Sequence, residues 1–162
     1  MKNGVMASNK SNSAFVVRSA TREDLPALIA LLKVLFSIEE DFIFDEEKQR
    51  RGISLMLDGC GKHRCMFVAE LSGEVVGMSS AQVLISTAEG SEAAVVEDVV
   101  VRENCRGCGI GVALMDAIIR WAGNRSIRRL QLLADKNNIA AIEFYRSQGW
   151  DFTQLICLRK LL

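Results

Sequence analysis

The residues with the clearest chemical potential lie between Val99 and Gly111, where a valine-rich run enters a glycine-rich turn. The turn reads Arg106-Gly107-Cys108-Gly109-Ile110-Gly111, and a helical pattern begins within it. Glycines at alternate positions allow backbone angles closed to other residues and let a ligand come close. Free N–H groups and the dipole at the start of a helix attract anions, and Arg106 adds a positive charge. The segment therefore predicts a site for a phosphate or pyrophosphate.

Two common phosphate-binding patterns do not describe this turn. A dinucleotide fingerprint requires G-x-G-x-x-G near the start of a βαβ unit, whereas the glycines here stand at 107, 109 and 111 after several strands. A P-loop requires Gly-Lys-Ser or Gly-Lys-Thr, which the turn lacks. The ligand is therefore expected to be a different phosphate-bearing molecule.

The elements that must position this turn follow from the hydrophobic periodicity. Thr21 and Asp24 form a capping signal before the first helix, and Gly149 closes the last one. The expected order is β-α-α-β-β-β-α-β-α-β, an α/β architecture in which helices cover both faces of a mixed sheet. Strands are expected at 15–18, 65–71, 75–86, 93–101, 129–134 and 152–158, and helices at 22–36, 45–57, 109–122 and 138–148.

Composition limits the class of protein. The 162 residues predict one domain over 13–162, after a polar, disordered lead-in over 1–12. A net charge of zero argues against a nucleic-acid binder. The absence of a long apolar run predicts no membrane partner, and the absence of an apolar leader predicts a cytoplasmic protein. The odd number of cysteines, five, indicates free thiols.

The chain resembles the GNAT superfamily, the Gcn5-related N-acetyltransferases. Their acyl-CoA loop follows [Q/R]-x-x-G-x-[G/A], which the turn from Arg106 to Gly111 matches. The family's Asn-x-x-Ala-x-x-x-Tyr helix, followed by Gly and an aromatic residue, is matched by Asn138 to Tyr145 and then Gly149-Trp150. The likeness extends over about residues 15–159. It implies the GNAT fold, with a mixed, mostly antiparallel sheet.

The resemblance also implies a donor, acetyl-CoA, and a set of residues that bind it without a metal. The loop would hold the pyrophosphate, and the strand before it would hold the pantetheine arm through backbone groups, one of which could polarise the thioester. Asn138 would reach the CoA arm or serve only as a helix cap. The implied donor-binding residues are Val99, Val100, Val101, Arg106, Gly107, Cys108, Gly109, Ile110, Gly111 and Asn138.

Acid and base roles follow from the same resemblance. Tyr145 would protonate the departing thiolate, because a phenol is protonated at neutral pH. Glu97 and Asp98 stand on the strand that enters the loop. Side chains alternate along a strand, so only one of the two is expected to face the acceptor. Glu97 is the favoured base, and Asp98 and a bound water are the alternatives.

The acceptor is expected to meet an acidic segment between the first two helices. Six of the nine residues from Glu39 to Glu47 are acidic, and Glu39, Glu40 and Asp41 are the predicted substrate-binding residues. Such a patch attracts cations, although a solvated loop with an acidic helix start would have the same composition. The predicted function is direct acetyl transfer to a primary amine of a small, cationic acceptor.

Other interpretations remain open at this stage. The chain could instead acetylate a protein or peptide amine, or act as a non-catalytic acyl-CoA sensor. The spacing Cys105-x-x-Cys108 is most simply a coincidence within the loop, and the alternative is a pair whose oxidation blocks CoA binding. The sequence leaves a homodimer open.

Overall fold

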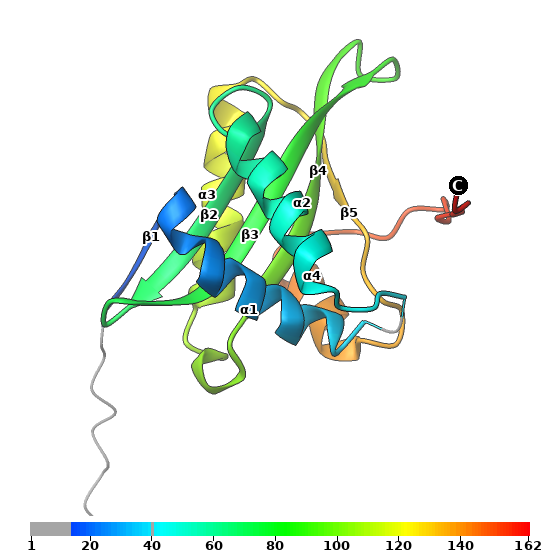
Figure 1. Cartoon of the computed structure of the whole chain (residues 1–162). Coiled ribbons are helices and arrows are strands. Elements are labelled where there is room, and N and C mark those ends of the chain that lie inside the picture. The colour runs from blue at the N-terminus through cyan, green and yellow to red at the C-terminus, as the bar shows by residue number, and fades with distance from the viewer. Residues whose placement is uncertain (1–13, 40) are drawn as a thin grey trace, which may run out of the picture.

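A five-stranded sheet forms the centre of the structure, a computed structural model that describes residues 14–39 and 41–162 (Figure 1). The lead-in expected over 1–12 lies outside the described residues. The strands follow one another in chain order across the sheet, antiparallel except for the last pair. Their bounds are β1 Phe15–Ser19, β2 Arg64–Leu71, β3 Glu74–Ser86, β4 Ser91–Val101 and β5 Leu130–Leu132.

Helices cover both faces of this sheet, as the sequence predicts (Figure 1). On one face lie α1 and α2, and α3 lies on the other, where α4 also packs through its aromatic residues. Short 3-10 turns at Arg22–Asp24 and Glu103–Cys105 precede α1 and α3. The helices are α1 Leu25–Phe36, α2 Glu46–Gly59, α3 Ile110–Asn124 and α4 Ile139–Ser147.

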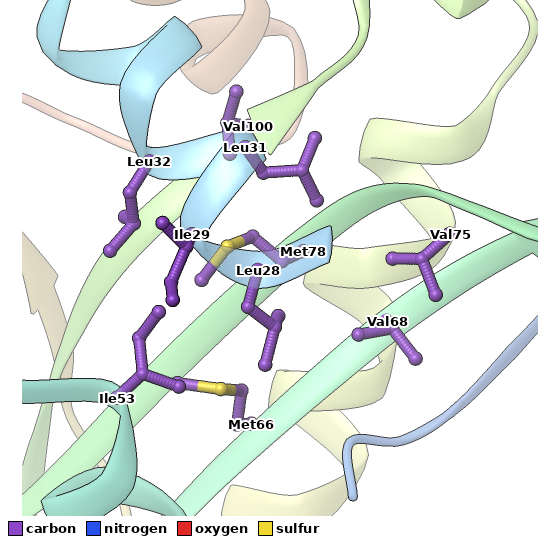
Figure 2. Close-up of a cluster of buried hydrophobic side chains, with 10 residues drawn as sticks. All are labelled: Leu28, Ile29, Leu31, Leu32, Ile53, Met66, Val68, Val75, Met78 and Val100. Atoms are coloured by element: carbon purple, nitrogen blue, oxygen red, sulfur yellow. The ribbon is translucent and has the colours of Figure 1, made fainter. Parts of the chain in front are cut away.

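The core beneath α1 and α2 is built from aliphatic and methionine side chains. Figure 2 shows Leu28 and Met78 at its centre, and both are fully buried. Ile53 of α2 and Met66 of β2 close one side of the cluster. Burying a side chain of this size stabilises the fold by roughly 1.5–3 kcal/mol. This face therefore holds α1 and α2 firmly against β2, β3 and β4.

The expected final strand over 152–158 is wrong. Residues after α4 form no strand, and the chain runs away from the sheet toward its C-terminus (Figure 1). Phe152, Leu155, Ile156 and Leu158 are all exposed. The segment has the apolar composition of a strand, but a strand also needs a neighbour. Among the described residues, no strand pairs with the outer edge of the three-residue β5.

None of the helices in the described ranges is both long and apolar enough to cross a membrane.

A buried carboxylate fixes the start of α1 against the sheet. Asp24 is 6% exposed, and its two oxygens accept hydrogen bonds of 2.8 Å from two nitrogens of Arg18. The backbone N–H of Thr21 donates to the same carboxylate at 2.7 Å, which completes the predicted capping box. Arg18 also pairs with Glu70 of β2. These bonds, above all those from Arg18, lower the pKa of Asp24.

We expect Asp24→Asn to lower the free energy of unfolding by about 2 kcal/mol at pH 7, because the charge-assisted bonds to Arg18 are lost. The lowered pKa means that ionised Asp24 stabilises the fold above pH 4 and that this stabilisation disappears as the pH falls further. The difference between variant and wild type should therefore shrink in acid. Urea unfolding across pH measures it.

The matched control is Asp58→Asn, since Asp58 also pairs with an arginine, Arg22, but is 53% exposed. Exposed ion pairs contribute roughly 0–1 kcal/mol. An equal loss of stability in the two variants would contradict a special role for Asp24.

Candidate active site

The glycine-rich loop adopts the backbone that the sequence predicts. Gly107 and Gly109 have φ angles of 75° and 83°, in the left-handed region that favours glycine. Gly109 is the N-cap of α3, and the first helical bond runs from the N–H of Ala113 to its carbonyl. The N–H groups of the preceding residues in the first turn have no helical acceptor. The loop therefore presents the donors that an anion requires.

Gly111 has a different reason to be glycine. It lies inside α3 with ordinary helical angles, and a Cβ placed on it would meet the ring of Phe144 at 3.3 Å. Phe144 belongs to α4 and directly precedes Tyr145. The first turn of α3 thus packs closely against the helix that carries the candidate acid.

Arg106 and Cys108 occupy exposed positions on the loop. The Arg106 side chain folds back, and its Nε donates to the carbonyl of Val101 at 3.1 Å. Cys105 is buried, whereas Cys108 is exposed. The loop therefore keeps a positive charge beside the free N–H groups of α3, at the end of β4.

The strand that leads to the loop has a free edge. β4 pairs with β5 only from Ala94 to Val96. Beyond this point, at Val99, Val100 and Val101, none of the described residues forms a strand on the β5 side. Backbone groups on that edge are available to a ligand, as the predicted contact with a pantetheine arm requires. Ile110, the first residue of α3, is buried and anchors the loop beneath this edge.

A bulge in β4 places two carboxylates in the same pocket. The register between β3 and β4 shifts between Met78 and Ser80, and Asp98 has a φ of 51° in the left-handed region. Glu97 and Asp98 consequently both line a pocket beneath α1 and α2. The expectation that strand alternation would turn only one of them to this side is wrong, because the bulge interrupts the alternation.

The two carboxylates differ in their surroundings. Asp98 is half-buried, and the hydroxyl of Ser80 donates to it at 3.3 Å. Burial, followed by the charge of Glu97, raises the pKa of Asp98 to about 6. Glu97 is exposed, and its Oε2 accepts a hydrogen bond of 3.0 Å from Gln82. Asp98 is therefore the carboxylate whose proton affinity suits a base at neutral pH.

Tyr145 lies in a half-buried aromatic group. Its ring meets the rings of Phe144 at 5.2 Å and Trp150 at 6.1 Å, edge to face in both cases. Burial and then the charge of Glu39 raise the pKa of Tyr145 to about 12. The phenol is thus protonated throughout the physiological range.

Glu39 connects the acidic segment to this site. Burial raises its pKa, with further contributions from the charges of Asp98, Asp135 and Asp41. Asp41 itself is exposed, and its carboxylate lies 3.8 Å from Arg159 of the C-terminal segment. Glu40 lies outside the described residues. Of the three predicted substrate-binding residues, Glu39 is therefore the one that the structure brings close to both Asp98 and Tyr145.

The pocket that contains the two carboxylates, here called the α2 pocket, has a volume of about 360 Å³. It lies between α2 and the sheet, with the end of α1 at one side. Apolar side chains contribute Leu32, Phe36, Ile53, Leu55, Met56 and Met66 to its lining, and Gly52 opens part of the wall. The polar residues are Lys48, Gln49, Arg64, Gln82, Glu97 and Asp98.

Asn138 caps α4, since its Oδ1 accepts a hydrogen bond of 3.1 Å from the N–H of Ala141. Ser80, Gln82 and Arg64 are site residues that the sequence does not single out. Ser80 and Gln82 alternate along β3 on the pocket side, but this pattern is common to half-buried strands. Only the register with β4 brings them to the carboxylates.

We expect Asp98→Asn to raise the free energy of unfolding by about 2 kcal/mol at pH 8. A raised pKa means that protonated Asp98 favours the fold at low pH and that this contribution is lost as the pH rises through about 6. Asparagine is neutral and accepts a left-handed φ, so the gain should vanish below pH 4. Chemical unfolding at several pH values measures it. Glu74→Gln, an exposed control, should show no such pH dependence, and a less stable Asp98→Asn at pH 8 would contradict the burial argument.

Comparison with known proteins identifies the family. The acetyltransferase (GNAT) family matches residues 28–150. An uncharacterised N-acetyltransferase of Methanocaldococcus jannaschii is 28% identical over 148 residues, which are 88% of this chain. The chain spans 63% of that relative's length. An uncharacterised N-acetyltransferase of Archaeoglobus fulgidus is 26% identical, covering 82% of this chain and 90% of the relative.

Solved structures agree with this assignment. An aminoglycoside acetyltransferase from an uncultured soil metagenomic sample matches with a TM-score of 0.73 and 25% identity, covering 94% of this chain and 98% of that one. An aminoglycoside N-acetyltransferase in complex with CoA matches in fold, with a TM-score of 0.78 and 18% identity over 92% of this chain and 95% of the other. A glycine-rich loop at the start of a helix, a free strand edge and a pair of carboxylates thus occur in a chain that belongs to the acetyltransferase (GNAT) family.

Proposed function

We propose that the protein transfers an acetyl group from acetyl-CoA directly to the primary amine of a small acceptor, which binds in the α2 pocket as a cation. The observation that carries this proposal is the grouping of Asp98, Glu39 and Tyr145. The charge of Glu39 contributes to the raised pKa of Tyr145, and the charge of Asp98 contributes to the raised pKa of Glu39. Glu97 and Asp98 line the α2 pocket and form no ion pair with a described cation, and with the nearby charge of Glu39 they favour a positively charged ligand.

The donor fits the residues present. The free N–H groups of α3 and the guanidinium of Arg106 would hold its pyrophosphate, and the open edge of β4 would hold its arm. When bound, acetyl-CoA supplies an activated acyl carbon and a thiol leaving group. The side-chain oxygen of Asn138 already accepts the N–H of Ala141 at the cap of α4, so its amide nitrogen is left for a ligand.

Asp98 is proposed to take the proton from the amine, in preference to Glu97. An alkylammonium has a pKa near 10, so an ordinary carboxylate is a poor acceptor for its proton. Raising the pKa of Asp98 to about 6 narrows that difference by about two units and leaves the group ionised at pH 7.5. The hydrogen bond from Ser80 holds the carboxylate in place.

Tyr145 is proposed to give its proton to the departing sulfur. The new C–N bond forms as the C–S bond breaks, so the products are an amide and a thiol. The ammonium gives one proton to Asp98 before it attacks. The nitrogen gives its second proton to the tyrosinate that remains after the phenol protonates sulfur, so Tyr145 ends protonated, and solvent takes the proton from Asp98.

The acceptor class draws support from one neighbour. The soil metagenomic relative is an aminoglycoside acetyltransferase, and aminoglycosides carry several amines that are cationic at neutral pH. The acidic surroundings of Glu39 suit such a charge, and the pocket volume of about 360 Å³ suits a small acceptor or one arm of a larger one.

We expect acetyl-CoA to be consumed with a panel of polyamines, aminosugars and basic amino acids, measured as thiol release. At saturating acceptor, kcat should rise with pH through an apparent pKa near 6, since Asp98 must be ionised. Asp98→Asn should lower kcat by about 10²-fold or more and abolish this rise of kcat with pH. If no amine of the panel causes thiol release although calorimetry shows that acetyl-CoA binds, a protein acceptor or an acyl-CoA sensor would be favoured.

For Tyr145→Phe we expect kcat to fall by about 10- to 100-fold while the Kd for acetyl-CoA stays near that of the wild type. Phenylalanine keeps the ring contacts with Phe144 and Trp150 and removes only the hydroxyl. Steady-state kinetics and calorimetry separate the two quantities. Unchanged turnover would remove Tyr145 from the mechanism, and weakened acetyl-CoA binding would make it a donor-binding residue instead.

A further inference from the structure

The α2 pocket has a second polar end at Arg64, and Gln82, which donates to Glu97, lies on the strand between Arg64 and the carboxylates. Arg64 stands at the start of β2, opposite Gln82 of β3, and both line the pocket. Ser80, which is fully buried and donates to Asp98, stands two residues before Gln82 on β3. Arg64 and Glu97 are therefore two strands and two residues apart, about 12 Å between α-carbons.

The guanidinium of Arg64 is held in place but carries an uncompensated charge. Its Nη1 donates to the carbonyl of Leu55 in α2 at 2.7 Å, which uses one of its five N–H donors. None of the described carboxylates lies within ion-pair distance of it. Lys48, the other cation of the pocket, lies 3.5 Å from Asp45. Arg64 is thus the cation in this pocket that lacks an acidic partner among the described residues.

Gly59 makes this position of Arg64 possible. It is buried at the end of α2, and a Cβ there would lie 2.7 Å from Cδ of Arg64 and 2.8 Å from its Nη1. Any side chain at residue 59 would push the arginine away. The position of the guanidinium therefore depends on a contact that can be altered without removing the charge.

Apolar side chains form much of the remaining wall of the pocket. Ile53 and Met56 of α2, Leu32 of α1 and Met66 of β2 provide this surface. A hydrocarbon chain is the ligand part that such a surface accepts, since it forms no hydrogen bonds and gains from leaving water. An anion on that chain would meet Arg64, because a guanidinium binds carboxylates through two parallel bonds.

We propose that the acceptor is an amino acid in the broad sense, whose amine lies at Asp98 and whose carboxylate is bound by Arg64 across a short aliphatic chain. This inference rests on the proposed function and narrows its acceptor. The ammonium end is still attracted by the carboxylates around Glu39. The separation of the two polar ends favours an amine several bonds from the carboxylate over an α-amine.

The test compares acceptors that differ only in the carboxylate. One series is γ-aminobutyrate, δ-aminovalerate and ε-aminocaproate, and the other is unbranched alkylamines of the same carbon count. We expect kcat/KM to be at least about tenfold higher for the best amino acid than for its matched alkylamine. Arg64→Gln should bring this ratio close to one, and Arg64→Lys should give an intermediate ratio.

Two further variants make the result specific. Gly59→Ala should lower the same ratio, because the new methyl group displaces Arg64 while the charge remains. Arg50→Gln should leave the ratio unchanged, since Arg50 is on the same helix but pairs with Glu46 and does not line the pocket. Thermal unfolding and acetyl-CoA binding show whether each variant is folded.

The outcomes separate this inference from the proposed function. Equal kcat/KM values for the two series, or a ratio that Arg64→Gln and Gly59→Ala both leave intact, would overturn the inference while amine acetylation stands. Turnover of alkylamines alone would have the same meaning. If neither series reacts although acetyl-CoA binds, both the inference and the small-amine acceptor are overturned.

Discussion

The bulge at Asp98 is the constraint on which the site depends. Because β4 carries an extra residue opposite β3, Glu97 and Asp98 both turn toward α2, and the strand changes direction before it reaches the loop. The parallel pairing with β5 ends at Val96, just before the bulge. One irregularity thus coincides with both a paired carboxylate site and a strand edge open to a donor. In a regular strand, the side chains of Glu97 and Asp98 would point to opposite faces of the sheet.

Asp24 and Asp98 show how the partners of a carboxylate decide its role. Asp24 accepts bonds from Arg18 and Thr21, so its charge is compensated and its pKa is lowered. Asp98 accepts a single long bond from Ser80 and has other carboxylates as electrostatic neighbours, so its pKa is raised. The first arrangement stabilises the fold. The arrangement around Asp98 makes the fold less stable at neutral pH. It also provides a group that binds a proton near neutral pH.

Much of the architecture could be predicted from the chain because local signals are strong. The glycines at 107 and 109, the cap at Thr21 and the aliphatic spacing of α1 and α3 each determine short-range geometry. The strand expected over 152–158 failed because its formation depends on a partner, which no local pattern encodes. The choice between Glu97 and Asp98 depended on the register of β3 with β4, and the position of Arg64 depended on Gly59. Contacts between distant segments decided both.

The close packing of Gly111 against Phe144 has a consequence for the order of events. The turn that would receive the pyrophosphate and the helix that carries Tyr145 meet without spare volume. Protein interiors resist compression, so a movement of a few tenths of an ångström at the first turn of α3 is passed to the ring of Phe144 and its neighbour. The affinity for acetyl-CoA and the position of the Tyr145 hydroxyl are therefore linked. Selection or engineering that alters one of them will alter the other as well.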